Sequence, residues 1–221
     1  MLNQEILSNN IPALHPDDSV LLAREAMEDH HLAHLPVIRD DLKLMGIVSE
    51  DILLNAGSDD MPLNLLQTSF SGAAVQGINH ILETVQVLTE FNLSLVPVIN
   101  KDGDYLGSIT SAELLKAVGK LIGTGDPGAI VVLELDKIDF SFAEISKLVE
   151  TNDAQITQLN TYSDAGTTSF YITLRINKLE ISDIIATFQR YEYKIKYYFG
   201  EEHYDNELRS NYNHLMNYLS I

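Results

Sequence analysis

A chain of 221 residues can hold one large domain or two small ones, and its 45% apolar and 21% charged residues supply a core and argue against disorder. Its 14 basic against 32 acidic residues, a net charge of −18, argue against binding to nucleic acid or to anionic membranes. The absence of cysteine excludes disulfides and thiolate chemistry. Because the first twenty residues lack a signal-peptide layout and no apolar run reaches the roughly 20 residues of a membrane span, we expect a cytoplasmic globular protein.

The N-terminal half contains an internal repeat. A shift of 61 positions places residues 14–54 on residues 75–115 without a gap. The matched pairs include Pro36 with Pro97, Gly46 with Gly107, and Ser49 with Thr110. We interpret the two segments as tandem copies of one folding unit.

Both copies predict the same order of elements. In the first, Asp18 or Ser19 can cap a helix whose apolar residues, from Val20 to Leu32, recur close to every 3.6 positions. Two strands and a short closing helix follow it. The predicted strands of the two copies cover residues 11–14, 35–38, 44–48, 73–75, 96–99 and 105–109. The other predicted helices cover residues 81–90 and the segments that Ser49 and Thr110 cap.

This doubled βαββα unit resembles a tandem CBS domain pair, also called the Bateman module. Three features carry the resemblance: the strands with a central proline at 35–37 and 96–98, the glycine-led segments 46–49 and 107–110, and the spacing between them. The resemblance implies a first repeat over residues 1–60 and a second over residues 61–120.

A glycine-rich linker at residues 121–128 precedes the C-terminal region, and no Lys-Ser/Thr follows its glycines as in a phosphate-binding loop. Beyond it the elements read strand, helix, strand, strand, helix, strand. They cover residues 129–135, a helix that Ser141 caps, 154–162, 170–176, 181–190 and 193–197, with a turn at 164–166. This βαββαβ order over residues 129–200 resembles a ferredoxin-like ACT domain.

The predicted fold class is therefore α/β (α+β), with two CBS repeats followed by an ACT-like domain. This combination is similar to the acetoin-utilisation regulatory protein family. An extra helix is predicted over residues 201–221, where apolar side chains recur every three or four positions, at Tyr204, Leu208, Tyr212, Leu215 and Leu219. It can pack on its own domain or form a dimer contact, and the sequence leaves both open.

In the CBS family an adenosine-type ligand binds in the cleft between the repeats. The resemblance implies that backbone groups beside the proline-containing strands contact adenine, while the glycine-led segment supplies a hydroxyl and a carboxylate that accepts from both ribose hydroxyls. The candidate residues in this chain are His34, Pro36, Ser49, Ser94, Val96, Pro97, Thr110 and Glu113.

This chain departs from the family pattern at the carboxylate in both repeats. The first repeat has Ile52 there, which can accept no hydrogen bond, and the second has Glu113 in place of aspartate. Thr110 and Glu113 also have capping-box spacing, which predicts that Glu113 folds back to the Thr110 N–H without any ligand. We therefore expect at most one ligand site, at the second repeat.

The two histidines His30 and His34 have a spacing that can place both on one helix face, but no zincin glutamate accompanies them and Pro36 ends the helix. We expect no metal site, and His34 either at the rim of the cleft or simply solvated.

Charge restricts the ligand class. Residues 1–120 carry 6 basic and 17 acidic side chains, 6 − 17 = −11, so AMP or S-adenosylmethionine is favoured over ATP. The loop at residues 136–140 lacks the glycine beside which ACT domains bind amino acids, and Asp139 and Phe140 would obstruct such a ligand. We expect no amino-acid site there.

No motif indicates catalysis: no glycine-flanked nucleophilic serine, Walker lysine or dinucleotide fingerprint is present. Two interpretations remain. In the first, a non-enzymatic homodimer senses an adenosyl ligand and signals to a protein partner through the ACT-like domain. In the second, the pockets are relics and the chain is a ligand-free dimerisation scaffold. Ile52 favours the scaffold, and Thr110 with Glu113 favours the sensor.

Overall fold

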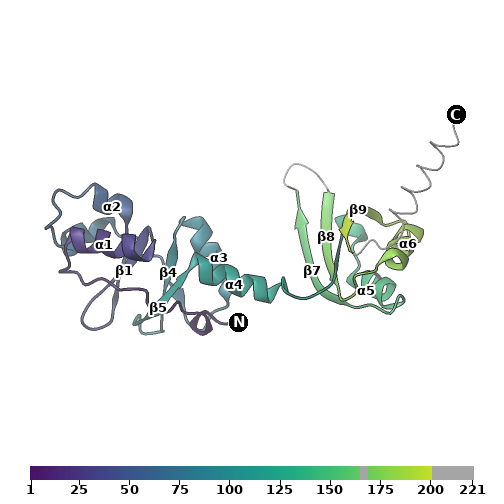
Figure 1. Ribbon diagram of the computed structural model, residues 1–221, viewed down its shortest axis with the longest axis horizontal. Helices are drawn as coiled ribbons and strands as arrows, with labels where there is room; N and C mark the ends of the chain where they lie inside the picture. Colours follow the sequence, from purple (N-terminus) through teal and green to yellow (C-terminus); the bar gives the residue numbers. More distant parts are fainter. Residues whose placement is uncertain (165–168, 201–221) are drawn as a thin grey trace, which may run out of the picture. The chain divides into compact units, whose positions relative to one another are not determined.

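The computed structural model describes residues 1–164 and 169–200. The predicted helix over residues 201–221 and most of the turn at 164–166 lie outside the described residues. The chain divides into two units, Met1–Leu121 and Ile122–Ile221 (Figure 1).

The first repeat consists of one helix, a two-stranded antiparallel sheet and a short closing helix. Its elements are α1 (Val20–His30), β1 (His34–Ile38), β2 (Leu44–Ser49) and α2 (Glu50–Leu54). The predicted cap is confirmed, because the Ser19 hydroxyl accepts from the Leu22 N–H at 3.2 Å. The helix ends at His30, two residues before the end of the apolar pattern at Leu32, since His31 adopts a left-handed conformation at φ 53°.

The second repeat copies this arrangement and adds one short strand. A 3-10 helix, Leu63–Ser69, connects the repeats, and β3 (Val75–Gln76), α3 (Ile81–Glu90), β4 (Leu95–Ile99), β5 (Tyr105–Thr110) and α4 (Ser111–Leu121) follow. The sheet order is β3-β4-β5, and the helix predicted at 81–90 is confirmed. Both hairpins shift register at equivalent places, after Val37 and after Val98.

The strand predicted at residues 11–14 is wrong. Only Leu14 makes a single parallel bridge, to Val37, so the first repeat lacks a counterpart of β3. Pro12 stands in the middle of the predicted strand and has no N–H to donate to a ladder. The strand predicted at 73–75 is likewise displaced, to Val75–Gln76.

The two repeat glycines allow a second segment of chain to cross each hairpin closely. Gly46 and Gly107 have φ values of +148° and +151°, a region that side chains disfavour. A Cβ on Gly46 would lie 2.9 Å from both the Phe70 Cβ and the Ser71 carbonyl oxygen, and a Cβ on Gly107 would lie 3.2 Å from Leu7. Glycine therefore recurs because a segment from the start of the other repeat passes directly over this position.

The second unit is a four-stranded antiparallel sheet with two helices. Its elements are β6 (Ala129–Asp136), a 3-10 turn at Lys137–Asp139, α5 (Phe142–Glu150), β7 (Ile156–Ser163), β8 (Ser169–Ile176), α6 (Ser182–Arg190) and β9 (Lys194–Phe199). The strand order β7-β8-β6-β9 is the ferredoxin-like order expected for βαββαβ. Both helices pack on one face, around Phe188.

These observations confirm the predicted mixed α/β class, with two similar repeats and a β-rich C-terminal region. Each unit has its own core, with residues of the two repeats forming two adjoining clusters in the first. Within residues 1–164 and 169–200, no helix is both long and apolar enough to cross a membrane.

Candidate functional site

The two repeats meet at His34 and Ser94. Ser94, immediately before β4, donates its backbone N–H to Nδ1 of His34 on β1 at 3.2 Å, and its hydroxyl lies 3.2 Å from the same nitrogen. Because a backbone N–H can only donate, Nδ1 accepts, and the neutral imidazole carries its proton on Nε2. Burial lowers the pKa of His34, and the nearby Asp51 carboxylate opposes this shift. His34 and Ser94, both predicted site residues, are thus in direct contact.

A second contact between the repeats lies at the start of α4. The Thr110 hydroxyl accepts from the Glu113 N–H at 3.2 Å, which confirms the predicted forward half of the cap. The Thr110 N–H, however, donates to the Ser8 hydroxyl at 2.9 Å, and the Ser8 N–H donates to the Ser108 carbonyl at 2.8 Å. Ser8 is a site residue that the sequence analysis missed.

The predicted return half of the capping box is wrong. Since Ser8 takes the Thr110 N–H, Glu113 is not needed there, and its carboxylate pairs with Lys116 at 2.7 Å. The Glu113 side chain is 40% exposed and remains within reach of a ligand.

Glu113 borders a cavity of about 380 Å³ between α4 and the N-terminal segment. Its lining residues are Met1, Glu5, Ile6, Leu7, Glu113, Lys116, Ala117 and Lys120. The N-terminal segment is fixed in place by the buried Asn3, which accepts from the Thr84 hydroxyl at 2.6 Å and donates to the Gln76 carbonyl at 2.9 Å. The volume lies within the roughly 300–1,000 Å³ of small-molecule sites.

The strand residues Pro36, Val96 and Pro97 are buried, so their side chains belong to the cores of the repeats. Register places Pro36 opposite Ile47 and Pro97 opposite Ser108. Any contact with a ligand at these three positions would involve the backbone rather than the side chain.

The equivalent position in the first repeat does not offer a carboxylate. Ser49 caps α2 by accepting from the Ile52 N–H at 3.3 Å, and it lies opposite His34 in the hairpin. Ile52 is half-buried and packs against the first repeat's core. The structure therefore brings His34, Ser49 and Ser94 together where the repeats meet, and Thr110 contacts Glu113 at the start of α4. Of the predicted residues, only Glu113 lines the cavity beside α4, where it supplies a carboxylate at the second repeat's equivalent of Ile52.

The tips of the two hairpins also hold the repeats together. The Lys43 ammonium pairs with Asp104 and donates to the Asp102 carbonyl, while the Tyr105 N–H donates to the Leu42 carbonyl at 2.9 Å. The bond from Lys43, with a second from Asn100, lowers the pKa of the Asp104 carboxyl.

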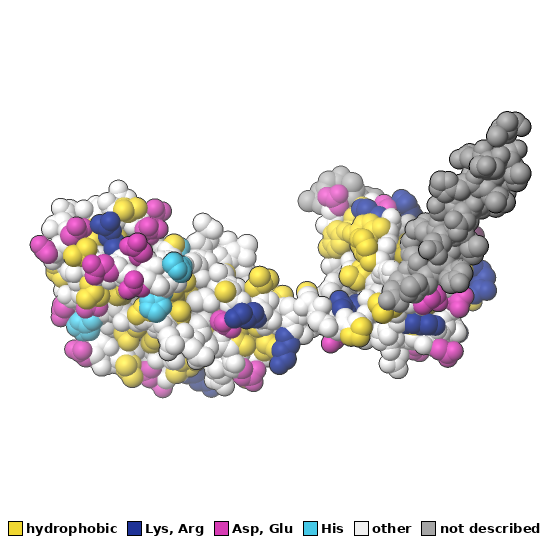
Figure 2. Space-filling view, in the orientation of Figure 1, with side chains coloured by type: hydrophobic (Ala, Val, Ile, Leu, Met, Phe, Trp, Pro, Cys, Tyr) yellow, Lys and Arg dark blue, Asp and Glu magenta, His cyan; other side chains and the backbone are white. Residues whose placement is uncertain are grey.

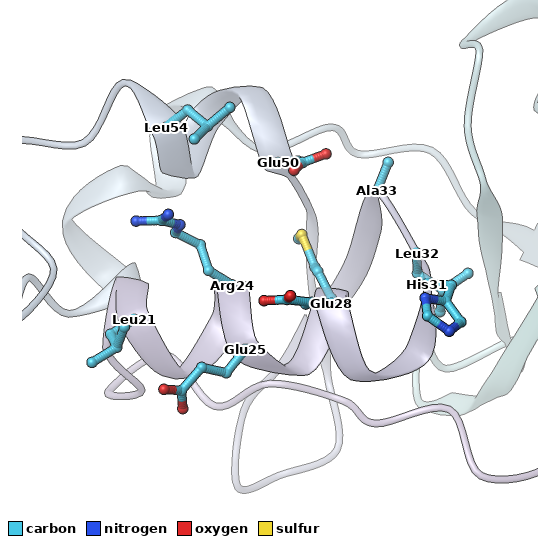
Figure 3. A pocket seen from close by; sticks show the side chains of 10 residues that line it. Leu21, Arg24, Glu25, Glu28, His31, Leu32, Ala33, Glu50 and Leu54 are labelled. Carbon is cyan, nitrogen blue, oxygen red and sulfur yellow. The ribbon is translucent and has the colours of Figure 1, made fainter.

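A larger cavity, about 690 Å³, opens between α1 and α2 (Figure 3). In this view Arg24, Glu28 and Glu50 reach toward the space between the two helices. Around it, Leu21 and Leu54 are 43% and 59% exposed. None of the predicted ligand residues lines it.

In the second unit, the loop after β6 carries no glycine and forms the 3-10 turn at Lys137–Asp139. Phe140 packs on Phe170, with ring centroids 5.5 Å apart. Across the described ranges of both units, no group of three His, Asp or Glu side chains is arranged to hold a metal ion.

Comparison with known proteins identifies the first unit. The sequence profile of the CBS domain matches residues 4–59 and 78–120, one match to each repeat. The first unit is therefore a tandem pair of CBS domains.

Among solved structures, a CBS domain pair/ACT domain protein from Thermotoga maritima is similar, with a TM-score of 0.51 and 16% identity over 55% of this chain and 99% of that one. At this identity the likeness concerns the fold alone.

Curated relatives match about half of this chain. A CBS domain-containing protein of Dictyostelium discoideum is 21% identical over 55% of this chain and 94% of its own length. A homoserine O-acetyltransferase of Methanocorpusculum labreanum is 27% identical over 52% of this chain. The present chain spans only 23% of that enzyme.

Proposed function

We propose that the CBS pair binds one adenosine-bearing ligand at the junction of the repeats, on the side of the second repeat, and that the chain is a non-enzymatic regulatory protein. The observation that carries this proposal is the carboxylate of Glu113. It is one turn beyond the Thr110 cap and beside a cavity, and the cap is complete without it because Ser8 accepts the Thr110 N–H.

The surrounding groups suit a nucleoside. Glu113 can accept from both ribose hydroxyls once Lys116 releases it, because each carboxylate oxygen has two lone pairs. His34 and Ser94 supply polar groups where the two repeats meet, and the backbone beside Pro36, Val96 and Pro97 can contact the adenine edge. Ser49 retains its capping role in the first repeat.

The charges of the cavity favour a ligand of low net charge. The side chains of Glu5 and Glu113 offset those of Lys116 and Lys120, so the lining side chains offer a triphosphate no net positive charge. AMP or S-adenosylmethionine is therefore preferred over ATP.

The second unit would transmit the signal. Its strand order supports an ACT-like domain over residues 129–200, joined to the repeats, 1–60 and 61–120, by the linker at 121–128. The crowded loop after β6 supports an ACT-like domain without an amino-acid site. We place the protein in the cytoplasm as a homodimer that signals to a protein partner, and the exposed Leu21 and Leu54 beside the larger cavity support self-association.

A ligand-free scaffold is the second candidate, and Ile52 favours it. This side chain packs against the core at the position where the first repeat would need a carboxylate to accept from ribose. The first repeat therefore has no acceptor for the ribose hydroxyls at this position. The two candidates differ in whether Glu113 affects ligand binding.

Isothermal titration calorimetry of the full chain with AMP, S-adenosylmethionine and ATP tests the proposal. Wild type should bind one of the first two at one site per chain. Glu113→Gln should weaken binding about 10- to 100-fold, since a hydrogen bond to a charged group contributes about 1.5–3 kcal/mol. Glu90→Gln, at an exposed glutamate of α3, is the matched control and should leave affinity unchanged. No binding of any of the three compounds would favour the scaffold, and tightest binding of ATP would contradict the charge argument.

A further inference from the structure

The first eight residues of the chain lie against the second repeat. The Asn3 N–H donates to the Asn79 carbonyl at 2.9 Å. The Gln4 N–H donates to the Gly77 carbonyl at 3.0 Å, and apolar side chains of this segment pack on the core of the second repeat. We call residues 1–8 the strap, and Figure 1 shows the N-terminus beside α4. A segment at the start of the first repeat in sequence is thus part of the second repeat in the structure.

The strap is tied to the second repeat at two points. The first tie is the fully buried side chain of Asn3, whose oxygen accepts from the Thr84 hydroxyl at 2.6 Å. The second tie is Ser8, whose hydroxyl accepts from the Thr110 N–H at 2.9 Å and whose N–H donates to the Ser108 carbonyl at 2.8 Å. Because a buried polar group that loses its partner is unfavourable, both ties oppose separation of the strap.

Between the two ties the strap is held by packing. Among the described residues, no hydrogen bond runs from residues 5–7 to the second repeat, and the Glu5 carboxylate accepts instead from the Leu2 N–H at 2.8 Å. Residues 5–7 form one wall of the cavity, and Glu113 on α4 belongs to the other. Hydrophobic and basic side chains lie together at the surface beside the N-terminus (Figure 2). The cavity is therefore closed on this side by a segment whose middle has no hydrogen bond to the rest of the repeat.

The connection between the strap and the first repeat is also loosely held. As far as the described residues extend, no hydrogen bond joins residues 9–13 to a helix or strand. The first hydrogen bond to β1 comes from Leu14, whose N–H donates to the Pro36 carbonyl at 2.8 Å. Segments with few hydrogen bonds and partly exposed packing open locally at a lower free energy than the core. The strap is therefore a part of this unit that can open while both repeats stay folded.

We propose that the strap opens and closes over this cavity, and that the adenosine-bearing ligand binds only while both ties are formed. The inference rests on the proposed function, because it takes the ligand site beside Glu113 as given. Closing the strap completes the second wall of the cavity, whereas opening it exposes a bound molecule to solvent. By thermodynamic linkage, a ligand that needs the closed strap stabilises the closed state. The strap thus couples ligand occupancy to the contact between Ser8 and Thr110.

Native-state hydrogen exchange of the full chain without ligand tests whether the strap opens separately. After correction for intrinsic rates, the Asn3 and Gln4 amides should exchange at least about 10-fold faster than the amides of β4, and low urea concentrations should accelerate them less. Thr84→Val should accelerate the Asn3 and Gln4 amides about 5- to 100-fold further, because it removes the donor to the Asn3 side chain. Thr89→Val, at an exposed position of the same helix, is the matched control and should leave them unchanged.

Two results would contradict separate opening. Exchange rates and urea dependences equal to those of β4 would show that the strap opens only when the whole unit unfolds. Equal effects of Thr84→Val and Thr89→Val would show that Asn3 is not a tie. Ser8→Ala repeats the test at the second tie, where the Thr110 amide should be accelerated, and circular dichroism establishes that each variant is folded.

The same measurement with AMP, or with S-adenosylmethionine if only that compound binds, tests the link to the ligand. At about 100 times its Kd, the ligand should slow exchange of the Asn3 and Gln4 amides about 100-fold, because the open strap does not hold it. Ligand binding by calorimetry with unchanged exchange of these amides would contradict the proposal and leave the proposed function intact. No binding of either compound would overturn the proposed function and, with it, the ligand-dependent half of this proposal, whereas exchange without ligand would still decide whether the strap opens.

Discussion

Alanine substitutions at three glycines of the CBS pair should have graded effects on stability. Gly72 has no atom within 4 Å of a built Cβ and no positive φ, so Gly72→Ala should be neutral or stabilise by up to about 1 kcal/mol through the unfolded chain. Gly103 has the same free space but a φ of +82°, so Gly103→Ala should cost about 1 kcal/mol. The difference between these two variants isolates the conformational cost.

Gly46→Ala adds a steric conflict to a positive φ. The new methyl group would lie 2.9 Å from the Ser71 carbonyl oxygen and 2.9 Å from the Phe70 Cβ, neither of which can rotate away. Overpacking costs about 1–3 kcal/mol and the backbone strain costs a similar amount, so the free energy of unfolding should fall by about 2–6 kcal/mol.

Urea unfolding of the full chain measures all three variants against wild type. If Gly46→Ala cost no more than Gly103→Ala, the close crossing over Gly46 would be refuted as the reason for the repeated glycine.

Two further substitutions test the contacts around the candidate site. Because burial lowers the pKa of His34 below its ordinary value of about 6.5, the unfolded chain binds the proton first. The contribution of His34 to stability should therefore be complete above about pH 6.5 and fall with decreasing pH. His34→Asn keeps a hydrogen-bond acceptor but cannot titrate, so it should remove this pH-dependent part of the stability. Identical pH slopes of the urea midpoint in the variant and in wild type would contradict the lowered pKa of His34. Thr84→Val should lower the free energy of unfolding by about 1–3 kcal/mol by leaving the buried Asn3 oxygen unpaired, whereas Thr89→Val, at an exposed helix position, should change it by less than about 0.5 kcal/mol. Equal losses from the two valine variants would show that the buried pair does not anchor the N-terminal segment.

Local sequence signals predicted most of the fold. The duplicated proline and glycine positions identified both repeats, and period-3.6 and alternating patterns located the helices and most strands. The two incorrect predictions have physical causes that the apolar pattern does not show. Pro12 removed a donor from an expected strand, and the left-handed His31 ended α1 before the apolar pattern did.

The site was predictable only where its contacts are local. The Thr110 bond to the Glu113 N–H spans three residues and follows from spacing alone. The competing bond, from the Thr110 N–H to the Ser8 hydroxyl, spans 102 residues, so no local pattern could show that the cap does not require Glu113. The sequence also did not predict the hydrogen bond from the Ser94 N–H to His34, because this bond depends on how the two repeats pack.

A crystal structure of the full chain with AMP tests the central claim most directly. It should place a ribose hydroxyl within hydrogen-bonding distance of the Glu113 carboxylate, with the Glu113–Lys116 ion pair broken. A nucleotide bound elsewhere, for example between α1 and α2, with Glu113 still paired to Lys116, would contradict the assignment of the site.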